Sequence, residues 1–449
     1  MTTFRQRWPS HLLSSAAFAI IAASSFQVDA AVTACETTVL TNSNFETPVG
    51  TKADQWCDDY ARGYSRVLLT PSKYNYVARA SISTTVPADQ RYAGPYQIVN
   101  LNQTQAKNVF LGAMIKGNNV VLDPEGWGAT LDVGFTVDCA AHPQFCEYHG
   151  DPVDNTLWCA TLPSSGTFDW RWVGLDSHTC GIGYVDSATG NWIDVPIKTA
   201  WVFPILGGAT GPAYFDLIQL MQFSPGPGAV TFMFDDGYKS TKSVAKPILD
   251  QYGFVGSAAA ISSVVGTSGA MTAQDLRDLQ TAGWDIASHS VTHPSMIGLS
   301  TTAARNELQN SKSTLTGFGL TIDSFVWPYG DYNQSLIGLT QVGLPTAPLY
   351  KSARNVEFDD NAYGTFPYAL KVLELVNTTQ IGEVQSWIDD LKAGGRWGIL
   401  LIHDVVNNPG TWAISPAMLD QVAQRVANSG VSVINYRTGY QTFANISAP

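Results

Sequence analysis

Hydrophobic and polar positions follow two different patterns along this chain, and the change falls near residue 224. Before that point, short runs alternate between apolar and polar residues and are separated by Gly, Pro, Asn and Asp, as in 108–117, 128–138 and 199–206. Period-two alternation between frequent turns is typical of antiparallel strands. We therefore expect an all-β sandwich over residues 31–223, without a helical stretch.

Beyond a linker rich in Pro and Gly at 224–228, apolar strands alternate with amphipathic helices. Thr272 is a natural N-cap and Gly283 a natural stop for one of these helices. Alternation of this kind over about 220 residues predicts parallel strands with crossover helices, which form an α/β barrel at 229–449. The strands are expected at 229–234, 257–265, 284–290, 324–330 and 397–405, and the helices at 242–253, 272–283, 381–395 and 416–430.

Residues 1–30 have the pattern of a cleaved secretory signal peptide. Arg5 and Arg7 precede a short apolar run rich in Ser and Ala, and small residues up to Ala30 offer a cleavage site. A membrane anchor is the alternative, but the run is short and no other segment is apolar enough to span a bilayer. We expect a protein that is secreted, periplasmic or extracellular.

Composition and charge narrow the class of protein. The 449 residues are 45% hydrophobic and 14% charged, which excludes disordered and coiled-coil chains. The formal net charge is −12 and Lys and Arg form no run, so nucleic acid and anionic membrane are poor partners. Six cysteines, all before Asp235, predict disulfides in an exported chain. A zinc cluster over 139–149 is the weaker alternative, because its spacing matches no common structural zinc site.

Three polar groups interrupt the apolar strands of the second half, each at the C-terminal end of a strand. They are Asp235 and Asp236, then His289 and His293, and finally His403. Functional residues of a barrel gather at this end. Two imidazoles and one carboxylate, with one position left open, form the usual catalytic zinc set. One aspartate is thus expected to hold a divalent cation with the histidine pair, and the other to accept a proton from water. An ordinary Asp-Gly turn and structural histidines are the alternatives.

Four segments occur in an order that resembles a known family. "TFMFDDG", "HSVTH", "WPYG" and "LIH" are similar to the motifs of the polysaccharide deacetylases, carbohydrate esterase family 4. The resemblance covers about 228–443 and implies a distorted (β/α)7 barrel. It also implies an acetylated polysaccharide as substrate, with hydrolysis of N-acetyl groups on a glycan that contains N-acetylglucosamine. An O-acetyl esterase acting on xylan is the alternative within the family.

The same resemblance assigns a role to each site residue. The catalytic residues would be Asp235 as base, His403 as the acid that protonates the leaving amine, and Tyr329, whose backbone N–H would help to hold the oxyanion. The metal ligands would be Asp236, His289 and His293, most simply around Zn²⁺, with Co²⁺ or Mn²⁺ as alternatives. The substrate-binding residues would be Trp327, Pro328 and Leu401, of which the leucine would line a pocket for the acetyl methyl group.

Two parts of the family pattern are missing. Many members carry an arginine two residues before the proline of the third motif, where it pairs with the base, but Val326 occupies that position. The aspartate–tryptophan fourth motif is not recognisable within 353–368, where Arg354 or Asp360 are candidates for part of its work. A glycan-binding protein with a decayed catalytic domain is therefore the rival hypothesis.

The front half resembles jelly-roll carbohydrate-binding modules. Its segments "VLTNSNFETP" and "GPAYFDLIQLMQF" are similar to the first and last strands of such modules. The resemblance implies a disulfide-bonded domain that recognises glycans, and it leaves calcium possible without a ligand cluster that requires it. Some tryptophans would stack on sugar rings, although a single tryptophan more often fills the core. The candidates are Trp56, Trp127, Trp158, Trp170, Trp172 and Trp192.

Overall fold

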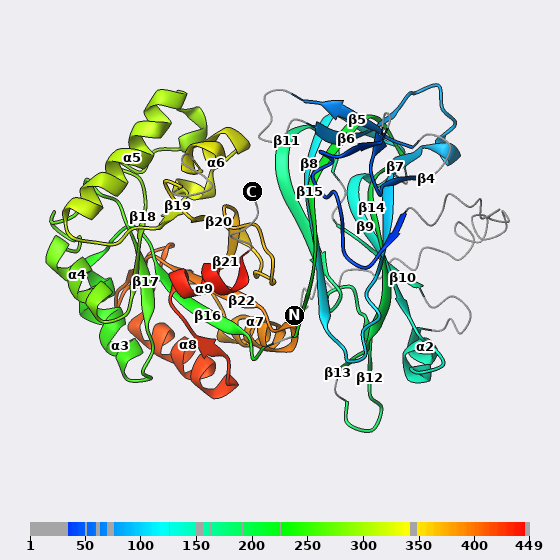
Figure 1. The fold of residues 1–449 in the computed structure, drawn as a ribbon. Coiled ribbons are helices and arrows are strands. Elements are labelled where there is room, and N and C mark those ends of the chain that lie inside the picture. The colour runs from blue at the N-terminus through cyan, green and yellow to red at the C-terminus, as the bar shows by residue number, and fades with distance from the viewer. Residues whose placement is uncertain are drawn as a thin grey trace.

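The chain forms a β-rich front half beside an α/β barrel (Figure 1). The structure is a computed structural model that describes residues 35–49, 52–59, 63–69, 76–124, 126–149, 156–161, 164–190, 192–224, 226–341 and 348–444. The expected signal peptide lies outside the described residues. None of the helices in the described ranges has the length and apolar character that a membrane crossing needs.

Two sheets make up most of the front half. One has the order β1-β7-β14-β9-β10, with β4 also paired to β7, and the other has the order β11-β8-β15-β6-β5. Alternate residues of both sheets point inward and form one core, which fits the alternation seen in the sequence. The first sheet contains β1 (Glu36–Thr37), β4 (Cys57–Asp59), β7 (Tyr92–Asn100), β9 (Gly128–Val137), β10 (Thr156–Ala160) and β14 (Ile197–Gly207). The second contains β5 (Ser65–Leu68), β6 (Tyr76–Ile82), β8 (Asn108–Leu122), β11 (Gly166–Asp176) and β15 (Ala209–Phe223). A jelly-roll module remains a prediction.

Short elements and three disulfides complete the front half. The expected disulfides are confirmed as Cys35–Cys57, Cys139–Cys146 and Cys159–Cys180, so the zinc alternative is wrong. The expectation of no helix is also wrong, because α2 (Pro143–His149) lies beside the second disulfide. Its seven residues are too few to show a helical period. The remaining elements are β2 (Pro48–Val49), β3 (Lys52–Ala53), η2 (Ala88–Gln90), β12 (Gly183–Val185) and β13 (Trp192–Asp194).

The second half is a parallel barrel, as the sequence predicted. Strands β17 to β22 pair side by side in sequence order. Strand β16 pairs with β22 on one side and with β17 on the other, which closes the ring. These strands are β16 (Ala229–Phe234), β17 (Gly256–Ala260), β18 (Asp285–Ser288), β19 (Ser324–Val326), β20 (Ser352–Phe358), β21 (Leu370–Glu374) and β22 (Trp397–Ile402). The short strand β25 (Ser432–Val433) pairs in parallel with Ala229 and Val230 at the start of β16.

Helices cover the outside of the barrel and close one end. Thr272 caps α4 as expected, because its side chain accepts a hydrogen bond from the Asp275 N–H, and the Asp275 carboxylate accepts one from the Thr272 N–H. The last helix, α9 (Tyr436–Phe443), packs on Trp397 at the start of β22, so it closes the N-terminal end of the barrel. The others are η3 (Thr241–Ala245), α3 (Lys246–Asp250), α4 (Ala273–Thr281), η4 (Met296–Gly298), α5 (Thr301–Gly317), η5 (Pro328–Gly330), α6 (Gln334–Thr340), α7 (Ile381–Gly394) and α8 (Pro416–Ser429), with the strand pair β23 (Asp404–Val405) and β24 (Ala413–Ile414).

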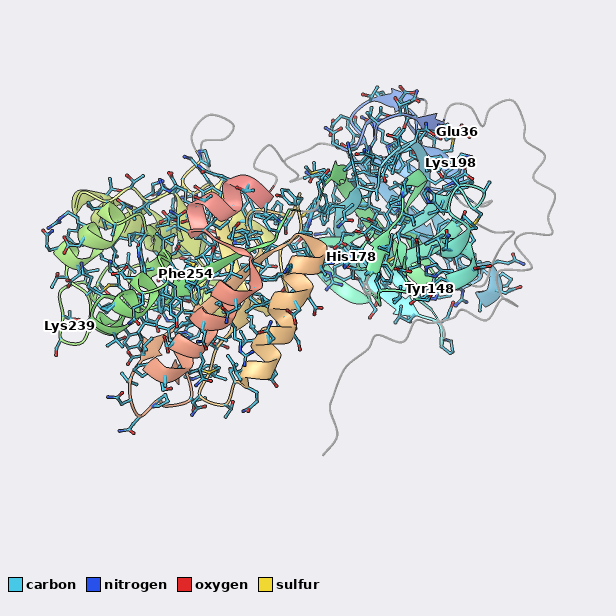
Figure 2. All side chains as sticks on the ribbon, turned by 90° about the horizontal axis from the view of Figure 1, so that it is seen from below. Glu36, Tyr148, His178, Lys198, Lys239 and Phe254 are labelled. Atoms are coloured by element: carbon cyan, nitrogen blue, oxygen red, sulfur yellow. A yellow bond between two sulfur atoms is a disulfide. The ribbon has the colours of Figure 1, made fainter. Side chains whose placement is uncertain are left out.

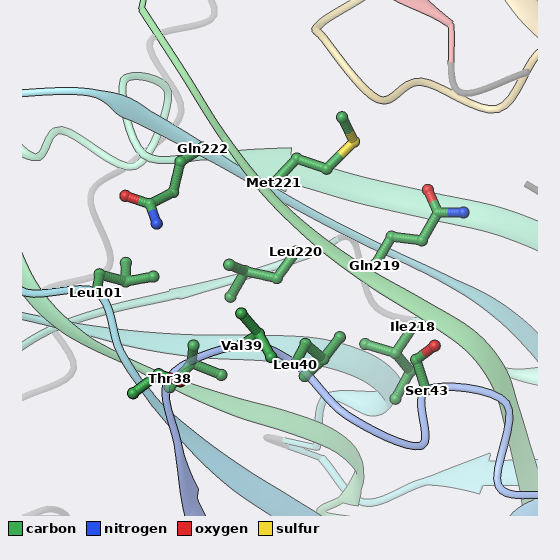
Figure 3. Close-up of a pocket in the computed structure, with 11 residues that line it drawn as sticks. Thr38, Val39, Leu40, Ser43, Leu101, Ile218, Gln219, Leu220, Met221 and Gln222 are labelled. Carbon is green, nitrogen blue, oxygen red and sulfur yellow. The ribbon is translucent and has the colours of Figure 1, made fainter. Parts of the chain in front are cut away.

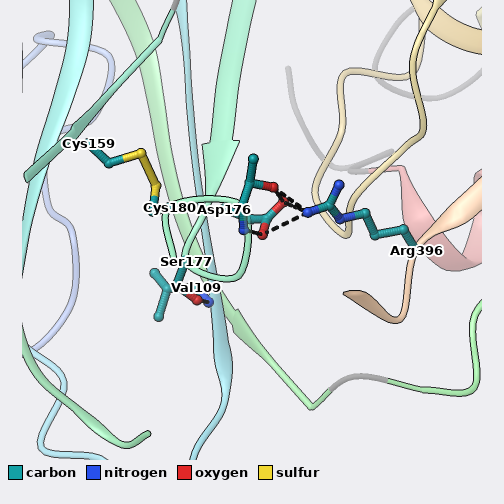
Figure 4. Close-up of a disulfide and its surroundings, with 7 residues drawn as sticks. Val109, Cys159, Asp176, Ser177, Cys180 and Arg396 are labelled. Atoms are coloured by element: carbon teal, nitrogen blue, oxygen red, sulfur yellow. Dashed lines mark hydrogen bonds and ion pairs between the residues drawn. A yellow bond between two sulfur atoms is a disulfide. The ribbon is translucent and has the colours of Figure 1, made fainter. Parts of the chain in front are cut away.

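The second sheet of the front half packs against the barrel. Trp172 of β11 stacks on Phe366, with ring centroids 5.5 Å apart. Arg396 binds Asp176 of the front half at 2.9 Å and Asp360 of the barrel at 3.0 Å, and all three side chains are largely buried. Figure 4 shows that the turn after Asp176 is tied down by the Cys159–Cys180 disulfide. The contact thus combines an apolar stack with a buried charge cluster.

Candidate active site

Alternating residues inside the barrel place the polar residues in one layer at its C-terminal end. Met233, Ala287, Val372 and Leu401 belong to the apolar cluster inside the barrel. Two positions further along the same strands stand Asp235, His289, Glu374 and His403. Since inward positions recur every second residue, these four side chains point into the same mouth. Because α9 covers the N-terminal end of the barrel, the candidate site lies at the C-terminal end, here called the mouth.

Asp236, His289 and His293 come together in this layer. The Oδ1 atom of Asp236 lies 3.4 Å from Nε2 of His289 and 3.6 Å from Nε2 of His293. The two Nε2 atoms are 3.1 Å apart, and all three potential ligand atoms lie within 4.8 Å of one another. Nδ1 of His289 is 2.9 Å from the carbonyl oxygen of Val326, so we assign the N–H to Nδ1 and the lone pair to Nε2. The structure therefore brings the three predicted ligands together.

This donor set fits a divalent cation. Oδ1 of Asp236 is buried and has no hydrogen-bond partner within the described part of the chain, and a cation would satisfy it. Although burial opposes ionisation of Asp236, the neighbouring histidines, His289 foremost, lower its pKa. Burial and the nearby His289 lower the pKa of His293, which favours the neutral ring that a metal requires. Two imidazole nitrogens and one carboxylate oxygen form the donor set of catalytic zinc sites.

Strained turns carry several of the site residues. Asp236, Ser290, His293 and Tyr329 have φ values of 67°, 64°, 59° and 59°, although none is glycine. Residues held in this left-handed region cost on the order of 1–3 kcal/mol each and cluster at functional sites. The turns follow β16, β18 and β19, so the strain lies at the mouth of the barrel.

Asp235 is held by an arginine from a neighbouring strand. Nη2 of Arg354 donates a hydrogen bond to Oδ1 of Asp235, and the two side chains are 0% and 3% exposed. The other carboxylate oxygen, Oδ2, faces Nε2 of His289 at 3.9 Å. Arg354 on β20 pairs in register with Val326 on β19. An arginine on the strand next to position 326 thus contacts Asp235.

His403 faces a carboxylate that the sequence interpretation missed. Its Nδ1 lies 3.7 Å from Oε1 of Glu374, at the end of β21. Burial raises the pKa of Glu374, and the charge of His403 opposes this effect. The alternation of side chains along a strand could have identified Glu374, because it stands two residues after the inward-facing Val372 and therefore also points into the barrel. Asp360, considered for the fourth motif, instead pairs with Arg396 at the contact between the halves.

The residues expected to bind substrate have different exposures. Trp327 is 0% exposed and its indole N–H donates to the carbonyl of Tyr368, so its side chain is part of the core and does not face a substrate. Leu401 is also 0% exposed and lines the interior of the barrel, and Pro328 is buried. Tyr329 is 62% exposed, and its ring lies 4.6 Å from the His293 ring.

Exposed apolar side chains of the barrel half gather around the same mouth. Within the described part of 226–444, all the large apolar residues that are strongly exposed lie at or after the C-terminal ends of barrel strands: Tyr238, Ile297, Tyr329, Val356, Phe358 and Trp412. The Trp412 ring lies 6.4 Å from the His403 ring, whereas the Tyr329 ring lies next to His293. Such a rim fits a ligand that extends beyond the reacting group.

The front half has a hollow of its own, with a volume of about 280 Å³ (Figure 3). It lies between the first strand segments and β15, and its lining includes Leu40, Ser43, Ile218 and Gln222. Among the residues that the structure describes, no ionisable side chain lines it.

Comparisons with known proteins agree with the motifs. The family model "Polysaccharide deacetylase" matches residues 224–345, which include Asp235, the three cluster residues and Tyr329. YxkH of Bacillus subtilis (strain 168), which carries a provisional polysaccharide deacetylase name, is 24% identical over 176 residues. That alignment covers 37% of this chain and 63% of YxkH.

The solved structures that the chain matches include two carbohydrate esterases. The Xyl-CE4 domain of a multidomain xylanase from the hindgut metagenome of Trinervitermes trinervoides is 20% identical, with a TM-score of 0.36 over 50% of this chain and 100% of that one. The family 4 carbohydrate esterase from Streptomyces lividans is 22% identical, with a TM-score of 0.33 over 47% of this chain and 95% of that one. The family match and the ordered motifs together confirm that the barrel half resembles the polysaccharide deacetylase family, carbohydrate esterase family 4.

Proposed function

We propose that this chain is a metal-dependent deacetylase that hydrolyses N-acetyl groups of a glycan containing N-acetylglucosamine. The observation that carries the proposal is the cluster of Asp236, His289 and His293, with Asp235 and His403 in the same layer of the barrel mouth. An O-acetyl esterase acting on xylan would use the same residues and is the second candidate.

Each residue of the mouth has a distinct task. A divalent cation, Zn²⁺ or alternatively Co²⁺ or Mn²⁺, would be held by the cluster and would polarise the acetyl carbonyl and make water easier to deprotonate. Asp235 accepts the proton of the attacking water through Oδ2, because Arg354 occupies Oδ1. The Tyr329 N–H donates to the carbonyl oxygen as negative charge develops, which is worth about 3 kcal/mol of barrier. His403 protonates the leaving nitrogen, and Glu374 stabilises the charged ring.

Other features support a polymer outside the cytoplasm as the substrate. The apolar rim extends beyond the cluster, which would let neighbouring sugar units bind beside the reacting one. The disulfides fit an oxidising compartment, as expected of a secreted or periplasmic protein. The net charge of −12 disfavours nucleic acid and anionic membranes as partners.

Acetate release from a panel of glycans tests the proposal. The panel contains chitin oligomers, poly-N-acetylglucosamine, peptidoglycan and acetylxylan, each with zinc and with chelator. Asp235→Asn should abolish release, whereas Asp359→Asn, a control at an exposed carboxylate paired with Lys371, should retain it. Release that survives both chelator and Asp235→Asn would contradict the mechanism.

The same panel separates the remaining alternatives. An alkoxide leaves more easily than an amine, so His403→Ala should reduce amide cleavage more than ester cleavage. Sugar binding without any acetate release would favour the glycan-binding protein with a decayed site. The buried Arg354–Asp235 pair argues against decay, because it supplies the partner that the third motif lacks.

A further inference from the structure

We propose that Glu307 on α5 is a positioning residue for the metal site, because it fixes the turn that brings His293 to the ion. The turn, here called the ligand turn, is the segment 289–293, which begins and ends with the two histidines of the cluster. The inference rests on the proposed function, since it requires a divalent cation at that cluster. It adds a residue that lies outside the four segments similar to the family motifs.

The two histidines of the cluster are fixed in different ways. His289 directly follows β18, where its backbone N–H donates to the carbonyl oxygen of Ala260 at 3.0 Å. Its Nδ1 lies 2.9 Å from the carbonyl oxygen of Val326. His293 stands five residues beyond the end of β18, and its side chain is 21% exposed. The placement of the His293 ring, with Nε2 only 3.1 Å from Nε2 of His289, therefore depends on the conformation of the ligand turn.

One carboxylate accepts three hydrogen bonds from this turn. The backbone N–H groups of Val291 and Thr292 donate to Oε2 of Glu307 at 2.7 and 3.0 Å, and the Thr292 hydroxyl donates to Oε1 at 2.8 Å. Successive backbone N–H groups that converge in this way form a nest, a concave binding site for an anion. Both carboxylate oxygens are used, and the residue directly before His293 is held at two points.

The conformation of the ligand turn needs support from its surroundings. Ser290 and His293 have φ values of 64° and 59°, and residues other than glycine stay in this left-handed region only where neighbouring structure holds them. The loop after β17 donates two backbone N–H groups to carbonyl oxygens of the turn. Glu307 binds the other side of the turn, where the N–H groups point. Loss of its carboxylate would therefore release the part of the turn that leads into His293.

Helix α5 is a firm support for this carboxylate. Leu308 and Ser311 belong to its buried face, and Glu307 is half-buried beside them. Oγ of Ser311 lies 2.7 Å from Oγ of Ser288, the last residue of β18, and both side chains are fully buried. Residues four apart lie on one face of a helix, so Glu307 and Ser311 hold the turn and the strand before it from the same helix.

The contact lies within the barrel half. Helix α5 is on the side of the barrel away from the front half (Figure 1). Figure 2 shows Lys239 of the barrel half at the opposite end of the molecule from Glu36 and Lys198 of the front half. Helix α7, which follows β21, lies across the barrel from α5. A variant of Glu307 therefore reports on the barrel, and α7 can carry a control.

Metal affinity, measured without any substrate, tests the assignment. The full chain is freed of metal and titrated with Zn²⁺ in competition with a chromogenic chelator, and the Co²⁺ form is followed by its visible absorption spectrum. Glu307→Ala should raise the Kd for zinc roughly 10–100-fold, as expected of a residue that orients metal ligands, and should change the cobalt spectrum. Glu307→Gln keeps an oxygen that can accept both N–H groups, so it should recover most of the affinity.

A control on α7 separates this role from a general effect on stability. The Glu383 carboxylate also accepts a backbone N–H, from Gln380 at 3.2 Å, so Glu383→Ala should lower stability in urea unfolding but leave the Kd for zinc unchanged. If Glu307→Ala does not fold, Glu307→Asp, whose side chain is one methylene shorter, should show the same rise in Kd.

The outcomes distinguish this inference from the proposed function. A Kd for Glu307→Ala equal to that of the parent, or an equal rise for Glu383→Ala, would overturn the inference and leave the proposed function standing. A parent chain that binds neither Zn²⁺ nor Co²⁺ would overturn both. Acetate release with and without chelator reports on the proposed function by itself.

Discussion

The buried pair of Asp235 and Arg354 gives the most quantitative prediction. Arg354→Met removes the guanidinium while keeping most of the apolar volume, and it leaves a carboxylate whose side chain is 3% exposed. Removing one partner of such a pair is unfavourable by about 3–5 kcal/mol, because the remaining charge is buried and unpaired. We expect the free energy of unfolding of the barrel half to fall by that amount. The value of kcat should also fall, because the carboxylate loses the contact that orients it.

A double-mutant cycle measures the pair directly. Denaturant unfolding is followed for the parent, Arg354→Met, Asp235→Asn and the double variant. The coupling free energy should be about 1–3 kcal/mol, since the residues are in contact. Arg425→Met, at an exposed arginine on α8, is the control and should change stability by less than about 0.5 kcal/mol.

A swap across the two strands tests whether position or identity matters. Val326 and Arg354 are register partners, so Val326→Arg combined with Arg354→Val returns a guanidinium to the same part of the mouth. This variant should regain part of the stability and of kcat that Arg354→Val alone loses. The reasoning is refuted if Arg354→Met unfolds like the parent and shows no coupling with Asp235→Asn.

Three further predictions concern other residues. Glu374→Gln should lower kcat roughly tenfold with little change in KM, measured by acetate release, because the charged form of His403 loses its carboxylate. Trp412→Ala should raise KM for a glycan hexamer more than for a disaccharide, because the ring is 61% exposed beside the site. Burial raises the pKa of Asp216 to about 8, so the folded front half holds this proton more tightly than the unfolded chain. The contribution of this carboxyl group to stability should be complete below about pH 4 and be lost as the pH rises from about 4 to 8, and Asp216→Asn should reduce the difference in urea unfolding between pH 5 and pH 9.

Much of the barrel could be predicted because its strands are continuous apolar runs. The run that becomes β16 is buried at all six positions, and the capping residue of α4 is visible as Thr272. Strands β20 and β21 were not predicted from the pattern, because they carry polar residues such as Arg354 and Glu374 among short apolar stretches. Their pairing is set by neighbouring strands, which a local pattern does not record.

The cluster of Asp236, His289 and His293 could be predicted because its residues lie within short motifs. The partners of Asp235 and His403 could not, since each comes from a strand more than 25 residues away in the chain. Arg354 reaches Asp235 only because β19 and β20 pair in register. The burial of Trp327 likewise depends on Tyr368, which approaches from a distant segment.

The ion pair between Asp176 and Arg396 also links disulfide formation to the arrangement of the two halves. The turn that follows Asp176 ends at Cys180, which is bonded to Cys159. Formation of this disulfide in the front half therefore constrains the residue that binds Arg396 of the barrel half. Breaking that bond should therefore loosen the angle between the two halves before either half unfolds. Small-angle scattering before and after mild reduction would detect a change in the relative orientation of the two halves. An unchanged profile would show that the contact between Asp176 and Arg396 persists without the disulfide.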